Sequence, residues 1–156
     1  MEIDKIIRKE NIIFDFEAKS KEEVLQKIVE ILVRNNNILD EKEVFKGYLK
    51  REDEGTTGFG KGIAIPHCKS SNIKNPEVII VSLVKGVNWL ALDEKDVNYI
   101  IGLAIPEEQS GDMYLSLLGA LASKLMEDDF VDNLLKMKDK NILVNYLKRN
   151  IQEELK

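Results

Sequence analysis

The chain has 156 residues, 44% of them hydrophobic, which suits one ordinary domain with enough apolar content for one core. Its formal net charge of −5 argues against sequence-independent binding to nucleic acid and against binding to anionic membrane surfaces. No uninterrupted apolar run approaches the roughly 20 residues that span a bilayer, and the first residues lack the features of a signal peptide, so we expect no membrane insertion.

The first third of the chain predicts a short strand followed by two helices. Residues 10–16 combine β-branched and aromatic side chains, which favours an extended segment. A Ser-x-x-Glu capping box begins at Ser20 and precedes an apolar stripe at helical spacing, which predicts a helix to about Arg34. A second capping pattern begins at Asp40, and the helix that it starts runs toward Arg51.

The rest of the chain predicts a sheet and further helices. Strands are predicted at residues 62–66, 77–85 and 97–105, with another extended piece at residues 87–92. Helices are predicted at residues 112–125, 129–137 and 140–149, followed by a charged tail at residues 150–156. This order favours a single α/β domain over residues 1–156, in which helices flank a mixed parallel and antiparallel sheet of about five strands.

The candidate functional residues gather between Arg51 and Cys68. This run holds four of the nine glycines, two threonines, an arginine and the only histidine of the chain, His67. Glycines at this spacing allow positive φ angles, and successive loop N–H groups can then form a concave site for an anion. The run therefore predicts a phosphate-binding loop.

The same residues argue against several other chemistries. One histidine and the absence of a Cys-x-x-Cys pair disfavour a metal site, and no cofactor is expected. The P-loop spacing is absent because Lys61 is followed by glycine, which disfavours nucleotide binding. Adjacent side chains of a strand point to opposite faces, so His67 should share a face with Ile63 and Ile65 and should not pair with Cys68. A single cysteine also rules out an intramolecular disulfide, which favours the reducing cytoplasm.

A histidine acting alone remains as the candidate catalytic group. Neutral imidazole is a good nucleophile near pH 7 and can take a phosphoryl group, whose oxygens are stabilised by N–H groups, hydroxyls and guanidinium. The candidate phosphate-binding residues around His67 are Arg51, Thr56, Thr57, Gly58 and Gly60. The alternatives are that the histidine is structural, that the glycines form only a flexible loop, and that the arginine is a solvated helix end; all three stay open here.

One signature closely resembles that of a known family. It consists of Arg51-Glu52 followed by Thr56-Thr57-Gly58-Phe59-Gly60-Lys61-Gly62-Ile63-Ala64-Ile65-Pro66-His67. This run is similar to the active site of the fructose/mannitol-type enzyme IIA domain of the bacterial phosphoenolpyruvate:sugar phosphotransferase system (PTS), and further likeness extends over roughly residues 5 to 148. The resemblance implies a mixed sheet flanked by helices.

The resemblance also implies a role for these residues. His67 would receive a phosphoryl group from the phosphocarrier protein HPr and pass it to enzyme IIB, which acts with the membrane component IIC. Arg51 and Thr57 would hold the phosphate. We expect HPr and IIB to use the same face around His67 and to bind transiently, since each must leave after transfer.

Tyr114 marks a departure from the family pattern. Relatives usually carry a second histidine in a Gly-Asp-x-His-Leu run, where this chain has Gly111-Asp112-Met113-Tyr114-Leu115. The tyrosine hydroxyl can donate a hydrogen bond to His67 or to a phosphate oxygen, but it carries no positive charge near neutrality. The alternative is that Tyr114 is only the first residue of the apolar stripe of its helix.

Three functions are therefore compatible with the sequence. The first is a phosphocarrier enzyme IIA that serves sugar uptake, with fructose as the favoured type of sugar. The second is a regulatory relative of the nitrogen-related branch, whose phosphorylation state controls a partner. The third is a non-catalytic module that binds an anion or a protein surface. The sequence indicates neither the sugar nor the oligomeric state.

Overall fold

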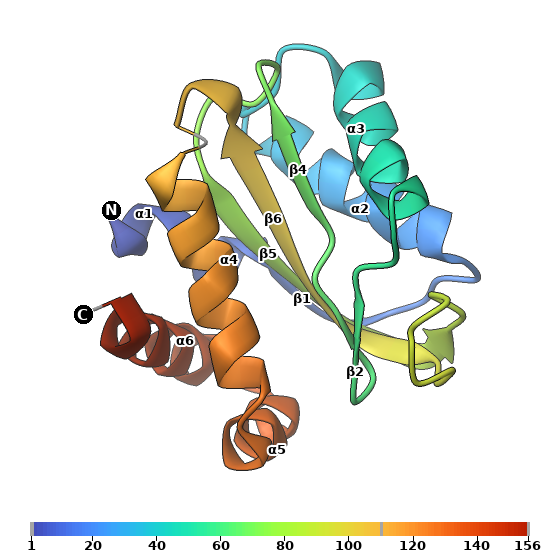
Figure 1. Cartoon of the computed structure of the whole chain (residues 1–156), viewed down its shortest axis with the longest axis vertical. Helices are drawn as coiled ribbons and strands as arrows, with labels where there is room; N and C mark the ends of the chain where they lie inside the picture. Colours follow the sequence, from blue (N-terminus) through green and yellow to red (C-terminus); the bar gives the residue numbers. More distant parts are fainter. Residues whose placement is uncertain (1, 110, 156) are drawn as a thin grey trace.

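A mixed sheet lies between two layers of helices in the computed structural model, which describes residues 2–109 and 111–155 (Figure 1). The strands are β1 Ile12–Phe16, β2 Gly58–Gly60, β3 Ile63–Ala64, β4 His67–Ser70, β5 Glu77–Val87 and β6 Val97–Pro106. The α-helices are α1 Ile3–Ile6, α2 Lys21–Arg34, α3 Glu41–Asp53, α4 Asp112–Leu125, α5 Asp128–Lys136 and α6 Lys140–Leu155. Short 3-10 helices occupy Lys9–Asn11 and Glu107–Gln109.

The sheet has the order β1-β5-β6-β3-β2, and β4 continues along the same side of β6 as β3. The central β5 and β6 are antiparallel, whereas β1 runs parallel to β5, and both β3 and β4 run parallel to β6. The prediction of a mixed parallel and antiparallel sheet flanked by helices is thus confirmed. None of the described helices is long and apolar enough to span a membrane.

The sheet has six strands: the strand predicted at residues 62–66 is the shorter β3, and two strands that were not predicted, β2 and β4, flank it. Between β3 and β4 the ladder with β6 is incomplete: Pro66 has no N–H to donate, although its carbonyl still accepts the N–H of Leu103 at 2.9 Å. Pairing resumes at His67, which lies opposite Leu103 of β6. The interruption therefore falls immediately before the only histidine of the chain.

Side chains alternate between two apolar clusters, one on each face of the sheet. Ile63 and Ile65 belong to the cluster under α1 and α4–α6, and Ala64 and Cys68 belong to the cluster under α2 and α3. Figure 1 shows these two helical layers on opposite sides of the strands. The predicted alternation is confirmed, and both faces of the central strands are covered.

The predicted helices fit the structure well at their starts. Ser20 caps α2 by accepting the N–H of Glu23 at 3.2 Å, and Asp40 caps α3 by accepting the N–H of Glu43 at 3.2 Å. Both caps are therefore confirmed.

Two other predictions about local structure are wrong. The extended piece expected at residues 87–92 is not a strand: β5 ends at Val87, and Leu90 has a left-handed φ of 62°. The last helix does not end at residue 149 but continues to Leu155, because Ile151 is fully buried against the core. Residues 150–155 are accordingly the end of α6 and not a tail.

A buried carboxylate ties the first residue of β5 to the N-terminal half of the chain. Glu77 is 3% exposed and forms an ion pair with Arg8. Its oxygens also accept from the amides of Asn11 at 2.9 Å, Asn35 at 2.9 Å and Asn37 at 2.7 Å. The interaction joins the end of α2 and the start of β1 to the central sheet.

Replacing Glu77 by alanine should lower the free energy of unfolding by about 3 kcal/mol, because four donors would lose their shared acceptor inside the protein. Urea titration followed by circular dichroism measures the change. The exposed Glu17 provides the control, and Glu17→Ala should shift stability by less than about 0.5 kcal/mol. Equal losses in the two variants would contradict a structural role for the carboxylate.

Candidate active site

A cavity of about 330 Å³ opens where α3, β4 and α4 meet. Figure 1 shows β4 lying between these two helices. The cavity is lined by Gly47, Lys50, Arg51, Glu54, His67, Cys68, Lys69 and Tyr114. Three of the residues predicted for the site, the histidine, the arginine and the tyrosine, are thus brought together.

His67 is held as the first residue of β4 with both ring nitrogens engaged. Its Nδ1 lies 2.8 Å from the carbonyl oxygen of Ile65, which can only accept, so Nδ1 carries the proton. Its Nε2 lies 3.0 Å from Nε of Arg51, which donates to it. The imidazole is therefore neutral, with its lone pair on Nε2.

Burial lowers the pKa of His67 below its usual 6.5. The hydrogen bond to Ile65 opposes this effect, the guanidinium of Arg51 adds to it, and the carboxylates of Glu52 and Glu54 oppose it. The net result is a pKa below 6.5, so the ring is unprotonated at neutral pH and can act as a nucleophile.

The only histidine of the chain should titrate with a midpoint below pH 6.5 in NMR spectra of the ring protons. Because the folded protein favours the neutral ring, protonation should begin only as the pH falls below that of an exposed imidazole. In Arg51→Gln the midpoint should move upward, since a nearby positive charge is removed. A midpoint at or above 6.5 in the native chain would overturn this account of the site.

Arg51 reaches His67 because α3 packs unusually closely on β4. A Cβ atom added at Gly47 would lie only 2.6 Å from Sγ of Cys68, so a larger residue would push the helix away from the strand. Arg51 follows Gly47 by one helical turn and faces the same side. Its Nη1 also donates to the carbonyl of Gly55 at 2.7 Å, which fixes the guanidinium beside Nε2 of the imidazole.

Thr56 and Thr57 do not line the cavity, and their hydroxyls are already engaged. The hydroxyl of Thr56 donates to the carbonyl of Trp89 and accepts the N–H of Gly58, both at 3.0 Å. The hydroxyl of Thr57 donates to the carboxylate of Glu52 and accepts the indole N–H of Trp89 at 3.1 Å. These two hydroxyls shape the turn after α3.

Gly60 lies in a β-hairpin away from His67 and not in a loop around it. It pairs with Ile63, whose neighbour in β6 is Tyr99, whereas His67 pairs with Leu103. Four residues along a strand correspond to about 13 Å. The positive φ of Gly60, 107°, serves the turn of this hairpin. The structure therefore does not bring this glycine to the histidine.

Glu52 is a positioning residue that the sequence did not reveal. It is only 6% exposed, and it accepts the N–H of Thr57 and the indole N–H of Trp89, both at 3.1 Å. In the sequence it stands among charged residues typical of a solvated helix end, and Trp89 lies 37 residues away. The carboxylate anchors the turn that follows α3 and thereby fixes the helix end that carries Arg51.

Glu52→Ala should lower the free energy of unfolding by about 3 kcal/mol, since three buried donors would lose their acceptor. The emission of Trp89, the only tryptophan, should shift to longer wavelength as water reaches the indole N–H. Asp53→Ala removes an exposed acid one residue along and should change neither quantity. Unaltered fluorescence and stability in Glu52→Ala would rule out the anchoring role.

The aromatic ring of Tyr114 packs against the imidazole ring of His67. The ring centroids are 5.8 Å apart and the planes are tilted by 58°, while the tyrosine also packs against the apolar cluster beneath α4. Burial raises the pKa of Tyr114, so its hydroxyl stays protonated near neutral pH. Tyr114 is thus part of the apolar stripe and also a wall of the cavity.

Lys69 is a second residue that the sequence did not single out. Its Nζ lies 5.9 Å from the centroid of the Tyr114 ring, on the rim of the cavity. By contrast, the side chain of Cys68 belongs to the opposite apolar cluster, and burial raises the pKa of its thiol to about 12. The predicted absence of a pair between Cys68 and His67 is confirmed.

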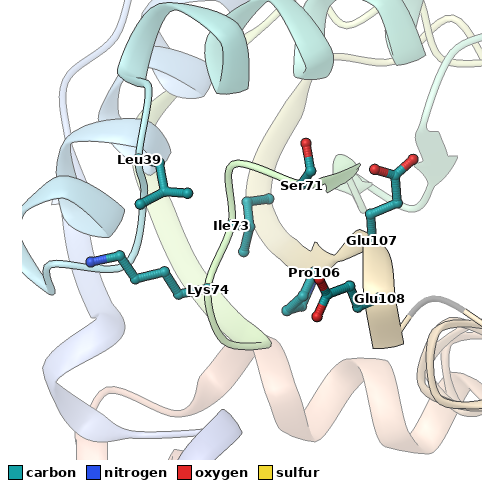
Figure 2. Close-up of a pocket in the computed structure, with 7 residues that line it drawn as sticks. All are labelled: Leu39, Ser71, Ile73, Lys74, Pro106, Glu107 and Glu108. Carbon is teal, nitrogen blue, oxygen red and sulfur yellow. The ribbon is translucent and has the colours of Figure 1, made fainter.

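A second cavity, of about 200 Å³, lies beyond the ends of β4 and β6. Figure 2 shows the side chains that line it: Leu39, Ser71, Ile73, Lys74, Pro106, Glu107 and Glu108. None of them is a residue predicted for the site. The only histidine of the chain therefore lines the cavity between α3 and α4 and not this second cavity.

A neutral, buried imidazole beside a guanidinium, at the wall of a cavity in an α/β sandwich, suits a component of phosphoryl transfer. Comparison with known proteins agrees: residues 5–150 match the model of the family described as "Phosphoenolpyruvate-dependent sugar phosphotransferase system, EIIA 2". The chain belongs to this family, and the resemblance seen in its sequence is confirmed.

Relatives from two branches of the family are similar to the chain. A PTS system fructose-like EIIA component of Escherichia coli is 33% identical over 111 residues, which are 71% of this chain and 74% of that protein. A nitrogen regulatory protein of Pseudomonas aeruginosa is 36% identical over 115 residues, 74% of each. The crystal structure of the nitrogen regulatory protein IIA-Ntr from Neisseria meningitidis superposes with a TM-score of 0.84 at 28% identity, over 92% of this chain and 97% of that one.

Proposed function

We propose that this protein is a cytoplasmic phosphocarrier that accepts a phosphoryl group from phospho-HPr on Nε2 of His67 and passes it to an enzyme IIB component. One observation favours Nε2 over Nδ1 as the atom that accepts the phosphoryl group. Nδ1 of His67 donates its proton to the carbonyl of Ile65, so the nucleophilic lone pair lies on Nε2.

The transfer exchanges one phosphorus–nitrogen bond for another. The Nε2 lone pair of His67 attacks the phosphorus of the donor's phosphohistidine, and the bond that breaks returns its electron pair to the donor imidazole. The proton on Nδ1 stays in place, and the carbonyl of Ile65 stabilises the positive charge that develops on the ring. No proton has to leave the ring.

Arg51 has two roles in this scheme. Before transfer its Nε–H donates to Nε2 of His67, so this hydrogen bond must break for the lone pair to reach phosphorus. The freed guanidinium then turns its donors to the oxygens of the phosphoryl group, which planar guanidinium groups bind in pairs. Thr57 takes part only if its hydroxyl leaves Glu52.

Sugar uptake of the fructose type is the leading role, with IIB handing the phosphoryl group on to a sugar at the membrane component IIC. A regulatory role is the second candidate, and the 36% identity to a nitrogen regulatory protein favours it. HPr and IIB would use the same face, because one imidazole serves both transfers. Phosphoryl transfer to a IIB protein in vitro would separate the two roles.

The decisive experiment is intact-mass spectrometry after incubation with phosphoenolpyruvate, enzyme I and HPr. The native chain should gain one acid-labile phosphate, and His67→Ala should gain none, because the chain has no other histidine. Circular dichroism of His67→Ala should match that of the native protein. Phosphate on the alanine variant would refute the assignment of His67, and an unmodified native chain would favour a non-catalytic module that binds an anion or a protein surface.

A further inference from the structure

We propose that Lys69 is a second phosphate-binding residue of the site, held over the ring of Tyr114 and directed at the phosphoryl group on His67. This inference rests on the proposed function and deepens it. The chemistry recognised is that of a phosphoryl dianion bound to nitrogen, with an ammonium group added to the guanidinium of Arg51 as its counter-charge.

The register of β4 places Lys69 on the same face as His67. The two residues pair with Leu103 and Ile105 of β6, so they stand two positions apart on a regular parallel ladder. Side chains at such positions point to the same side of a sheet, with Cα atoms about 7 Å apart. The four-carbon stem of a lysine spans this distance, so the ammonium can reach a group on Nε2.

Tyr114 supplies the surface that steers the lysine toward the cavity. Nζ of Lys69 lies 5.9 Å from the centroid of the tyrosine ring, and that ring lies 5.8 Å from the ring of His67. An ammonium over an aromatic face is attracted by the electrons of the ring. The ring of Tyr114 therefore lies between the ammonium group of Lys69 and the imidazole of His67 and contacts both, although the tyrosine hydroxyl itself carries no charge.

The charge of the site supports the same assignment. A phosphoryl group adds negative charge to a chain that already has a net charge of −5, and Glu54 also lines the cavity. Within the described residues, 2–109 and 111–155, no ion pair joins Lys69 to a carboxylate. Its charge is available to a ligand, and its ammonium group offers three hydrogen-bond donors.

Single-turnover rates of phosphorylation test the proposal, with two donors: phospho-HPr and the small molecule phosphoramidate. Lys69→Gln should slow both reactions on the order of tenfold, since one charged donor to the transition state is lost. Lys69→Arg should recover most of the rate, because it restores the positive charge. Lys74→Gln, an exposed lysine of the other cavity (Figure 2), is the matched control and should react at the native rate.

The outcomes separate this inference from the function on which it rests. Native rates in Lys69→Gln with both donors would overturn the role of Lys69 and leave the phosphocarrier intact. A defect with phospho-HPr alone would also overturn it, because the lysine would then act in docking of the donor. A native chain that neither donor phosphorylates would overturn the phosphocarrier function and this inference with it.

Discussion

The hydrogen bond from Nδ1 of His67 to the carbonyl of Ile65 is the interaction on which the site depends. It is possible because the backbone of Ile65 faces away from β6: its N–H donates to Thr57, whereas the carbonyl of Pro66 accepts the N–H of Leu103 in β6. The carbonyl of Ile65 is therefore available to a side chain two residues later. The bond fixes the tautomer and the orientation of the ring at once.

The second constraint on the site is the register in which β4 pairs with β6. His67 and Cys68 face opposite sides of β4, so a slip of one residue against β6 would bury the histidine under α3 and turn the thiol to the side of α4. The tight fit between Gly47 and Cys68 opposes such a slip, because only the small glycine admits the sulfur at this distance. Packing on the α3 face of β4 thus fixes the position of His67, whose side chain lies on the other face.

The sequence predicted the local features well and the long-range ones poorly. Helix caps, apolar strands and the choice of Arg51 as a residue near His67 follow from short patterns, and the family signature lies in one continuous run. The glycines of that run were interpreted as a phosphate loop, although a tight hairpin requires the same conformational freedom. Glu52 and Lys69 were missed because their partners, Trp89 and Tyr114, lie 37 and 45 positions away in the chain.

The edges of the sheet have a consequence for the behaviour of the protein at high concentration. The two outer strands of the main order, β1 and β2, have only five and three residues, and β4 beside them has four. Long unpaired edges recruit strands from other molecules, whereas short ones offer few free backbone groups. The two long strands, β5 and β6, lie in the interior of the sheet. The architecture thereby disfavours edge-to-edge aggregation while it keeps β4 open to the cavity.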